Sequence, residues 1–228
     1  MRFVALLVNF VIKKMKHPIQ KPDSLILDMD GTLWDNVNTY VLAWNAALKE
    51  LGHAEQVSRE SLMGLMGMEA QQLLDALIPN VPKEKQDLLF DEVIVQYQKL
   101  IPTMQPYIYP GVMEGLKQLH TKYKLLLLSN CEEGGLVNLM NHTKTTHLFL
   151  DYMEHGQNNM PKNHNLKLLK ERHNLESPVY IGDTEGDSHE SDLAGVPFVF
   201  MTYGFGTTEN YHLKFDTFSE LTNYYMNL

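Results

Sequence analysis

The feature that most constrains this chain is a short apolar run followed at once by two aspartates and a glycine. Residues 25–27 (Leu-Ile-Leu) precede Asp28 and Asp30, and Gly31 gives the backbone freedom to turn. Such a run is typical of a buried strand in a parallel sheet, whose carboxyl edge binds ligands in open α/β folds. In an ideal strand Asp28 and Asp30 project to the same side, which suits a nucleophile and an acid/base. Taken alone, the stretch fits an ordinary polar turn equally well.

The composition indicates one packed, acidic protein. Hydrophobic residues make up 44% of the 228, which supports a core and argues against global disorder. The net charge of -9, without a block of basic residues, argues against nucleic acid or an anionic membrane as the main partner. A metal ion would still permit an anionic substrate. Cys131 is the one cysteine, so we expect no internal disulfide and a reducing compartment, the cytoplasm.

Residues 1–22 are predicted to be an N-terminal extension. Their apolar segment, residues 3–12, is far shorter than the roughly 20 residues of a spanning helix. Asn9 interrupts it, and no small-x-small cleavage site follows before Pro18. We therefore expect neither secretion nor stable membrane association.

Residues 36–106 are predicted to form an all-helical insertion, a cap. Apolar residues at helical spacing over 37–51, an N-cap signal at Ser58, and helical patterns over 68–77 and 83–100 indicate about four helices. Six side chains of this region and its flanking loops are candidates for facing a substrate: Trp34, Asn36, Arg59, Met63, Met66 and Tyr107.

Strands and helices alternate again after residue 106. Strands are predicted at four apolar runs: residues 123–128, 148–152, 179–181 and 196–201, the last of which is expected to be the last buried strand. This alternation predicts an α/β fold with a doubly wound parallel sheet. We expect the core to comprise residues 23–35 and 107–228, on either side of the insertion.

Polar side chains follow three of the predicted strands: Asp28 and Asp30, then Ser129 and Asn130, then Asp183 and Asp187. The carboxyl ends of parallel strands lie at one edge of a sheet, so these groups can converge. Four carboxylates without a counter-charge would raise one another's pKa values, and oxygen-only ligands select Mg²⁺. A helix N-cap at residues 182–187 and a turn at 129–130 would explain each motif alone, but not their joint occurrence.

These motifs resemble those of the haloacid dehalogenase-like hydrolases, in the phosphatase branch with a helical cap (phosphoglycolate phosphatase-like). The resemblance covers about residues 23–228. DMDGT at 28–32 matches the first family motif, LLLLSN at 125–130 the second, and GDTEGD at 182–187 the fourth. Lys162 matches the lone lysine of the third motif, although many relatives have Lys-Pro where this chain has Pro-Lys. Lys167 is the alternative.

The resemblance implies a Mg²⁺-dependent phosphatase that hydrolyses a small phosphomonoester. It implies that Asp28 forms an aspartyl-phosphate, while Asp30 protonates the leaving alcohol and later deprotonates the attacking water. The implied metal ligands are Asp28, Asp30 through its backbone carbonyl, Asp183, and Asp187 directly or through water. The implied phosphate-binding residues are Ser129, Lys162 and Asn130, with Thr32 supporting the first loop.

The motifs leave the substrate and two other functions open. Phosphoglycolate, sugar phosphates, nucleoside monophosphates and pyridoxal phosphate are the implied candidate substrates. A phosphomutase of the same family returns the phosphoryl group to a bound sugar, but residues 36–106 contain no Arg/Lys-rich cluster that favours it. A phospho-acceptor signalling domain is a third alternative, against which the chain length and Asp30 argue. A P-loop nucleotide binder is disfavoured, because no GxxxxGK[ST] motif is present.

Overall fold

The computed structural model describes residues 21–68 and 70–228, so nearly all of the predicted extension at 1–22 lies outside the described residues. Six parallel strands form one sheet in the order β5-β4-β1-β6-β7-β8. The strands are β1 (Ser24–Leu27), β4 (Lys124–Ser129), β5 (Asp151–Glu154), β6 (Pro178–Gly182), β7 (Phe198–Met201) and β8 (Leu213–Phe215). This confirms the predicted α/β fold with a parallel sheet.

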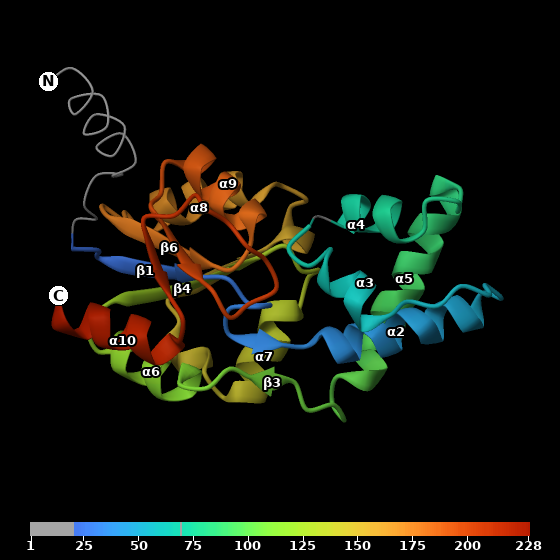
Figure 1. Cartoon of the computed structure of the whole chain (residues 1–228), viewed down its shortest axis with the longest axis horizontal. Helices are drawn as coiled ribbons and strands as arrows, with labels where there is room; N and C mark the ends of the chain where they lie inside the picture. The colour runs from blue at the N-terminus through green and yellow to red at the C-terminus, as the bar shows by residue number, and fades with distance from the viewer. Residues whose placement is uncertain (1–20, 69) are drawn as a thin grey trace, which may run out of the picture.

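Helices cover both faces of the sheet (Figure 1). One face carries α6 (Val112–His120), α7 (Gly135–Thr143) and α10 (Phe218–Asn227); the other carries α8 (Lys162–Arg172) and α9 (Glu185–Ala194). Successive strand residues point to opposite faces, so Leu25 and Leu27 join the first core and Ile26 the second. Burial on both faces explains why β1 and β4 are continuous apolar runs.

Four helices, which we call the helical unit, lie beside the carboxyl edge of the sheet (Figure 1). They are α2 (Val37–Glu50), α3 (Arg59–Met63), α4 (Ala70–Leu77) and α5 (Lys83–Leu100). Ser58 caps α3 by accepting a hydrogen bond from the Ser61 backbone N–H at 3.1 Å. The unit has its own apolar cluster, which includes Trp44, Leu62 and Leu89. The predicted helices are therefore present, while their role as a cap and the division into domains stay predictions.

A two-stranded antiparallel ribbon marks the place where the chain leaves the sheet and returns to it. The ribbon pairs β2 (Trp34–Asp35) with β3 (Tyr107–Ile108). It fixes both ends of the helical unit at one point on the sheet's edge. Two residues per strand are too few to give a periodic pattern, and the sequence did not predict them.

One detail of the predicted strands is wrong. The strand β5 covers Asp151–Glu154 rather than 148–152, because a short 3₁₀ helix occupies Thr146–Leu148. The run at 196–201 contains β7, which is the last buried strand, as predicted, but a further strand that was not predicted, β8, follows it at the edge of the sheet. The three residues of β8 at the edge of the sheet are half-buried or exposed, so the sequence contains no apolar run from which this strand could be predicted.

No helix within residues 21–68 and 70–228 is long and apolar enough to cross a membrane.

Candidate active site

Asp28 and Asp30 lie in the loop that follows β1. The strand ends at Leu27, so neither aspartate belongs to it. The Asp28 backbone N–H donates to the Ile181 carbonyl at 2.9 Å, and the chain then turns at Gly31 with φ of 86°. A Cβ atom on Gly31 would collide with the Asp183 carboxylate. Glycine is thus required twice here, by the left-handed backbone and by the close approach of an acidic side chain.

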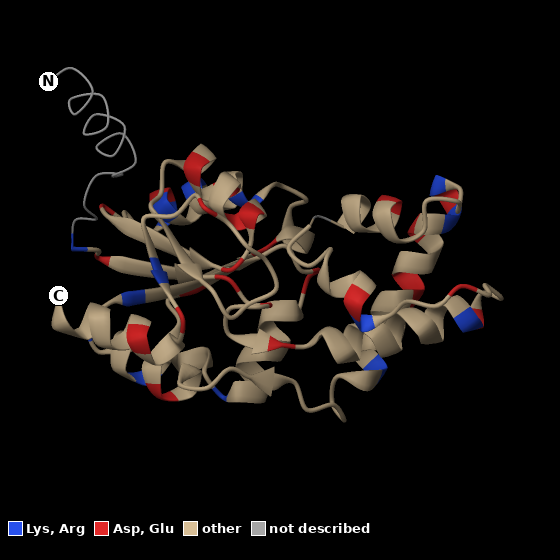
Figure 2. Cartoon of the chain, in the orientation of Figure 1, with Lys and Arg blue, Asp and Glu red and all other residues tan. Residues whose placement is uncertain are grey.

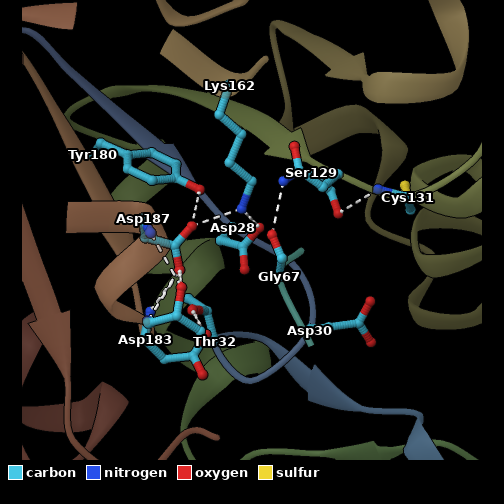
Figure 3. A network of polar contacts seen from close by, with 12 residues as sticks. Asp28, Asp30, Thr32, Gly67, Ser129, Cys131, Lys162, Tyr180, Asp183 and Asp187 are labelled. Carbon is cyan, nitrogen blue, oxygen red and sulfur yellow. Dashed lines mark hydrogen bonds and ion pairs between the residues drawn. The ribbon is translucent and has the colours of Figure 1, made fainter. Parts of the chain in front are cut away.

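Three buried aspartates meet beside this loop: Asp28 follows β1, Asp183 follows β6, and Asp187 lies in the first turn of α9 (Figure 3). Asp28, Asp183 and Asp187 each offer a carboxylate oxygen, and these oxygens lie within 4.8 Å of one another. Burial raises the pKa of Asp28 to about 6 and raises the pKa of Asp183 well above its ordinary value. A hard divalent cation fits this site, because every donor of the cluster is an oxygen.

Lys162 is the cationic group of the cluster. It is the first residue of α8, and its Nζ donates to Asp28 at 2.8 Å and to Asp187 at 2.6 Å. Burial would lower the pKa of Lys162, but the two carboxylates outweigh burial and raise it. The charge of Lys162 likewise outweighs burial at Asp187 and lowers the pKa of that carboxyl group. Lys167, the alternative, is exposed on the outer side of the same helix.

Asp187 is held from three sides. Its carboxylate accepts hydrogen bonds from the Tyr180 hydroxyl at 2.9 Å and from the Thr184 hydroxyl at 2.7 Å. Thr184 is also the N-cap of α9 and accepts from the Asp187 backbone N–H at 3.1 Å. The N-cap alternative and the acidic cluster are therefore both realised, since one capping box positions the carboxylate.

Asp30 does not share the direction of Asp28. Its carboxylate points away from Asp28 (Figure 3) and accepts from Trp34 Nε1 at 3.0 Å and from the Tyr40 hydroxyl at 3.0 Å. The expectation that both project to one side is wrong, because the strand ends before either residue. Burial, and then the charge of Asp28, raise the pKa of Asp30 to about 8. At neutral pH this carboxyl group carries a proton that it can donate.

The other predicted site residues lie around the cluster in different roles. Ser129 ends β4, and its hydroxyl accepts from the Cys131 backbone N–H at 3.2 Å. Asn130 donates from Nδ2 to the Gly67 carbonyl of the helical unit at 2.7 Å. Thr32 donates to Asp183 at 3.2 Å and does not border the cavity described next, so it positions that carboxylate.

A cavity of about 590 Å³ extends from these residues into the helical unit. Asp28, Asp30, Ser129, Asn130 and Lys162 border it on the side of the sheet. Pockets of this size enclose drug-sized ligands. The cavity therefore joins the charged cluster to a space large enough for the rest of a substrate.

Of the six predicted substrate-facing side chains, Met66 borders this cavity and the other five do not. Arg59 instead donates to Asp35 and to Asn38. Asn36 donates to the Tyr97 hydroxyl at 3.0 Å. Sequence reasoning missed Tyr40 and Tyr180, which bind Asp30 and Asp187. Neither tyrosine belongs to a motif, so their contacts became visible only through the fold.

The family model described as "Haloacid dehalogenase-like hydrolase" matches residues 25–201. The chain therefore belongs to this family of hydrolases, as the resemblance predicts. The match spans every element that supplies the acidic cluster and Lys162.

The similar proteins include two named phosphoglycolate phosphatase. The one from Rhodobacter capsulatus is 27% identical over 212 residues, which cover 87% of this chain and 94% of that protein. The one from Aliivibrio fischeri is 26% identical over 197 residues, 81% of this chain and 86% of that protein. A crystal structure of a predicted phosphatase from Clostridium acetobutylicum superposes with a TM-score of 0.79 at 19% identity, covering 92% of this chain and all of that one. The structural likeness supports the fold.

Proposed function

We propose that this hydrolase is a Mg²⁺-dependent phosphatase acting on small phosphomonoesters through an aspartyl-phosphate at Asp28. The observation that carries the proposal is the meeting of three buried carboxylates with Lys162, beside a cavity that Asp28, Lys162 and Asp30 border. Membership of the family and the phosphatase names of its relatives support it. The helical unit acts in this proposal as the cap that encloses the substrate.

The acidic cluster would hold Mg²⁺ through Asp28, Asp183 and Asp187, with the Asp30 backbone carbonyl as a further ligand. When bound, Mg²⁺ supplies positive charge that lets a phosphate dianion approach these carboxylates. Lys162 supplies the second positive charge, from the protein itself. Its two ion pairs in the free protein keep it charged until the phosphoryl oxygens arrive.

In the first step, an Asp28 carboxylate oxygen forms a bond to phosphorus, and the bond from phosphorus to the leaving oxygen breaks. Asp30 in its acid form gives its proton to that oxygen, which leaves as an alcohol. The raised pKa of Asp30 suits this role, because the proton is still bound at neutral pH. Lys162 and the Ser129 hydroxyl bind the phosphoryl oxygens, together with the Asn130 backbone N–H, and so hold phosphorus in line.

In the second step, Asp30 takes a proton from a water molecule, and the water oxygen attacks phosphorus. The bond from phosphorus to Asp28 breaks and inorganic phosphate leaves. Asp30 is then protonated and Asp28 is a free carboxylate again. Tyr40 and Trp34 hold the Asp30 carboxylate at the wall of the cavity, where both leaving alcohol and water can reach it.

The charge distribution supports a metabolite rather than a nucleic acid as substrate. Lys and Arg are interspersed with Asp and Glu along the described chain (Figure 2), and the net charge is -9. A nucleic-acid interface needs clustered basic side chains to neutralise phosphates. A cytoplasmic location is our further proposal, and the single cysteine supports it.

The test is release of inorganic phosphate from phenyl phosphate by the purified protein. We expect turnover with Mg²⁺, loss of turnover in EDTA, and recovery when excess Mg²⁺ is added. Release of free phosphate also separates a phosphatase from a phosphomutase, which would return the group to a sugar. A folded protein with Mg²⁺ that releases no phosphate from any monoester tested would refute the proposal.

A further inference from the structure

Among residues 37–68 and 70–100, none of the side chains that border the cavity from the helical unit is charged. The aromatic and aliphatic side chains that border it there include Tyr40, Trp44, Leu62, Met66, Phe90 and Tyr97. The indole of Trp44 packs against Phe90 with ring centroids 6.3 Å apart, and Tyr40 packs against Tyr97 at 5.2 Å. These contacts fix the rings in place, so the apolar wall is built before a ligand arrives.

Positive charge is confined to the opposite end. Among the bordering residues that the structure describes, Lys162 is the one Lys or Arg, and its Nζ already contacts Asp28 and Asp187. Arg59, the basic side chain of the helical unit predicted to face the substrate, is paired with Asp35 away from the cavity. The phosphate end thus leaves no cation for a second anionic group.

The remaining charged side chains around the cavity are acidic. Glu132, Glu133 and Glu154 border it beside the cluster. The Glu154 carboxylate accepts hydrogen bonds from the backbone N–H groups of Gly134 and Leu136. A carboxylate on the substrate would lose water against an apolar wall, without a cation, and near further carboxylates.

Neutral polar groups complete the wall. Asn130 Oδ1 is buried and has no hydrogen-bond partner among residues 21–68 and 70–228. The side chains of Gln98, Asn138 and Gln157 also border the cavity. Amide groups of this kind both donate and accept hydrogen bonds, so they suit hydroxyl or amide groups of a substrate, but they carry no positive charge to pair with a second anionic group.

We propose that the alcohol part of the substrate is bulky and uncharged, with apolar or aromatic surface, and that esters carrying a second anionic group are excluded. This inference rests on the proposed phosphatase function and narrows its substrate class. The proposed substrate differs from phosphoglycolate, after which the similar proteins are named, because the alcohol part of phosphoglycolate is small and carries a carboxylate.

The test compares kcat/KM for phosphate release in Mg²⁺ from four aryl esters and from phosphoglycolate. Phenyl phosphate is the reference, 1-naphthyl phosphate adds a ring, and 3-carboxyphenyl and 3-carbamoylphenyl phosphates differ in charge at nearly constant shape. We expect the naphthyl ester to exceed the phenyl ester about tenfold. The carbamoyl ester should stay within about fivefold of the phenyl ester, and the carboxylate should fall at least about 100-fold below its carbamoyl partner.

Two matched variants each introduce one positive charge, the first in the wall of the cavity and the second outside it. Ile94 borders the cavity on α5, whereas its neighbour Val95 is 42% exposed and does not border it. Ile94→Arg should raise kcat/KM for the carboxyphenyl ester at least about tenfold and lower that for the naphthyl ester. Val95→Arg should leave kcat/KM for both of these esters unchanged.

Three outcomes decide the inference. The expected order of esters, with rescue by Ile94→Arg alone, supports it. Equal hydrolysis of the carboxylate and carbamoyl esters, or a preference for phosphoglycolate, overturns it while the phosphatase function stands. Absence of phosphate release from all five esters, by protein whose circular dichroism shows it folded, overturns the function on which the inference rests.

Discussion

The same residue type behaves in opposite ways at the two edges of the sheet. At the carboxyl edge, burial raises the pKa values of Asp28 and Asp183. At the amino edge, burial also opposes ionisation of Asp23 and Asp151, but hydrogen-bond donors outweigh it and lower both pKa values. Asp23 accepts from the Glu176 backbone N–H at 2.8 Å, and Asp151 accepts from Arg172 and His173 at 2.8 and 2.7 Å.

The difference indicates that the aspartates of the amino edge stabilise the fold, whereas those of the carboxyl edge destabilise it. At the amino edge each aspartate is partly exposed and satisfied by nearby donors, as expected for groups that tie the ends of elements together. At the carboxyl edge three buried carboxylates share one lysine, an arrangement that is unfavourable without a further cation. A fold retains such a cluster where binding or catalysis needs it.

The largest effect should come from the proposed nucleophile. Asp28→Asn removes the attacking oxygen while keeping the shape, so kcat for phenyl phosphate should fall at least about 1,000-fold. Thermal unfolding should show that the variant remains folded. Asp87→Asn, at an exposed position of α5, is the matched control and should retain full turnover. Normal turnover by Asp28→Asn would remove Asp28 from the mechanism.

The next effect tests the charge balance of the cluster. In EDTA, Lys162→Met leaves three buried carboxylates without their cation, so the free energy of unfolding should fall by about 3–5 kcal/mol. Urea denaturation measures it. Lys167→Met changes an exposed lysine of the same helix and should cost less than about 0.5 kcal/mol. If both variants lose the same stability, the cluster does not depend on Lys162.

The acidic cluster at the carboxyl edge of the sheet could be predicted from the sequence, whereas the walls of the cavity beside it could not. Asp28, Ser129 and Asp183 follow apolar runs long enough to predict strands, and parallel strands bring their ends together whatever the details of packing. Lys162 was predicted only through the family resemblance, because a lone lysine has no pattern of its own. The walls contributed by Trp44 and its neighbours have the same composition as any helical core, so pattern alone could not show that a cavity lies between them.

Similar limits explain the other misses. The direction of Asp30 depends on a turn that begins one residue after β1, which an ideal strand does not include. The strand β8 has no apolar run, and the ribbon of β2 and β3 has two residues per strand. Arg59 was a candidate for facing a substrate because of its place in the helical insertion, but its side chain instead forms an ion pair with Asp35.

Tyr40 joins the helical unit to the carboxyl edge of the sheet through its hydrogen bond to Asp30, and its hydroxyl allows a finer test of the proposed mechanism. Tyr40 lowers the pKa of Asp30, so Tyr40→Phe should raise it above about 8. The acid form then persists to higher pH, and the alkaline limb of kcat/KM for an alkyl phosphate should move upward by about one pH unit. Tyr152→Phe makes the same change elsewhere on the cavity and should leave the limb in place. A downward shift in Tyr40→Phe would contradict the assignment of Asp30 as the acid.

The smallest effect should come from the amino edge, where Asp151 lies far from the chemistry. Its folded pKa is below the ordinary value, so its contribution to stability is present at neutral pH and is lost as pH falls below about 4, the ordinary pKa of an aspartate. Asp151→Asn should therefore lower the free energy of unfolding at pH 7 by less than about 1 kcal/mol, because solvent screens the pair with Arg172. The difference should vanish in urea denaturation at pH 2 to 3, while kcat/KM at pH 7 stays unchanged. Loss of activity in this variant would mean that Asp151 at the amino edge affects the reaction, contrary to the difference in role proposed for the two edges.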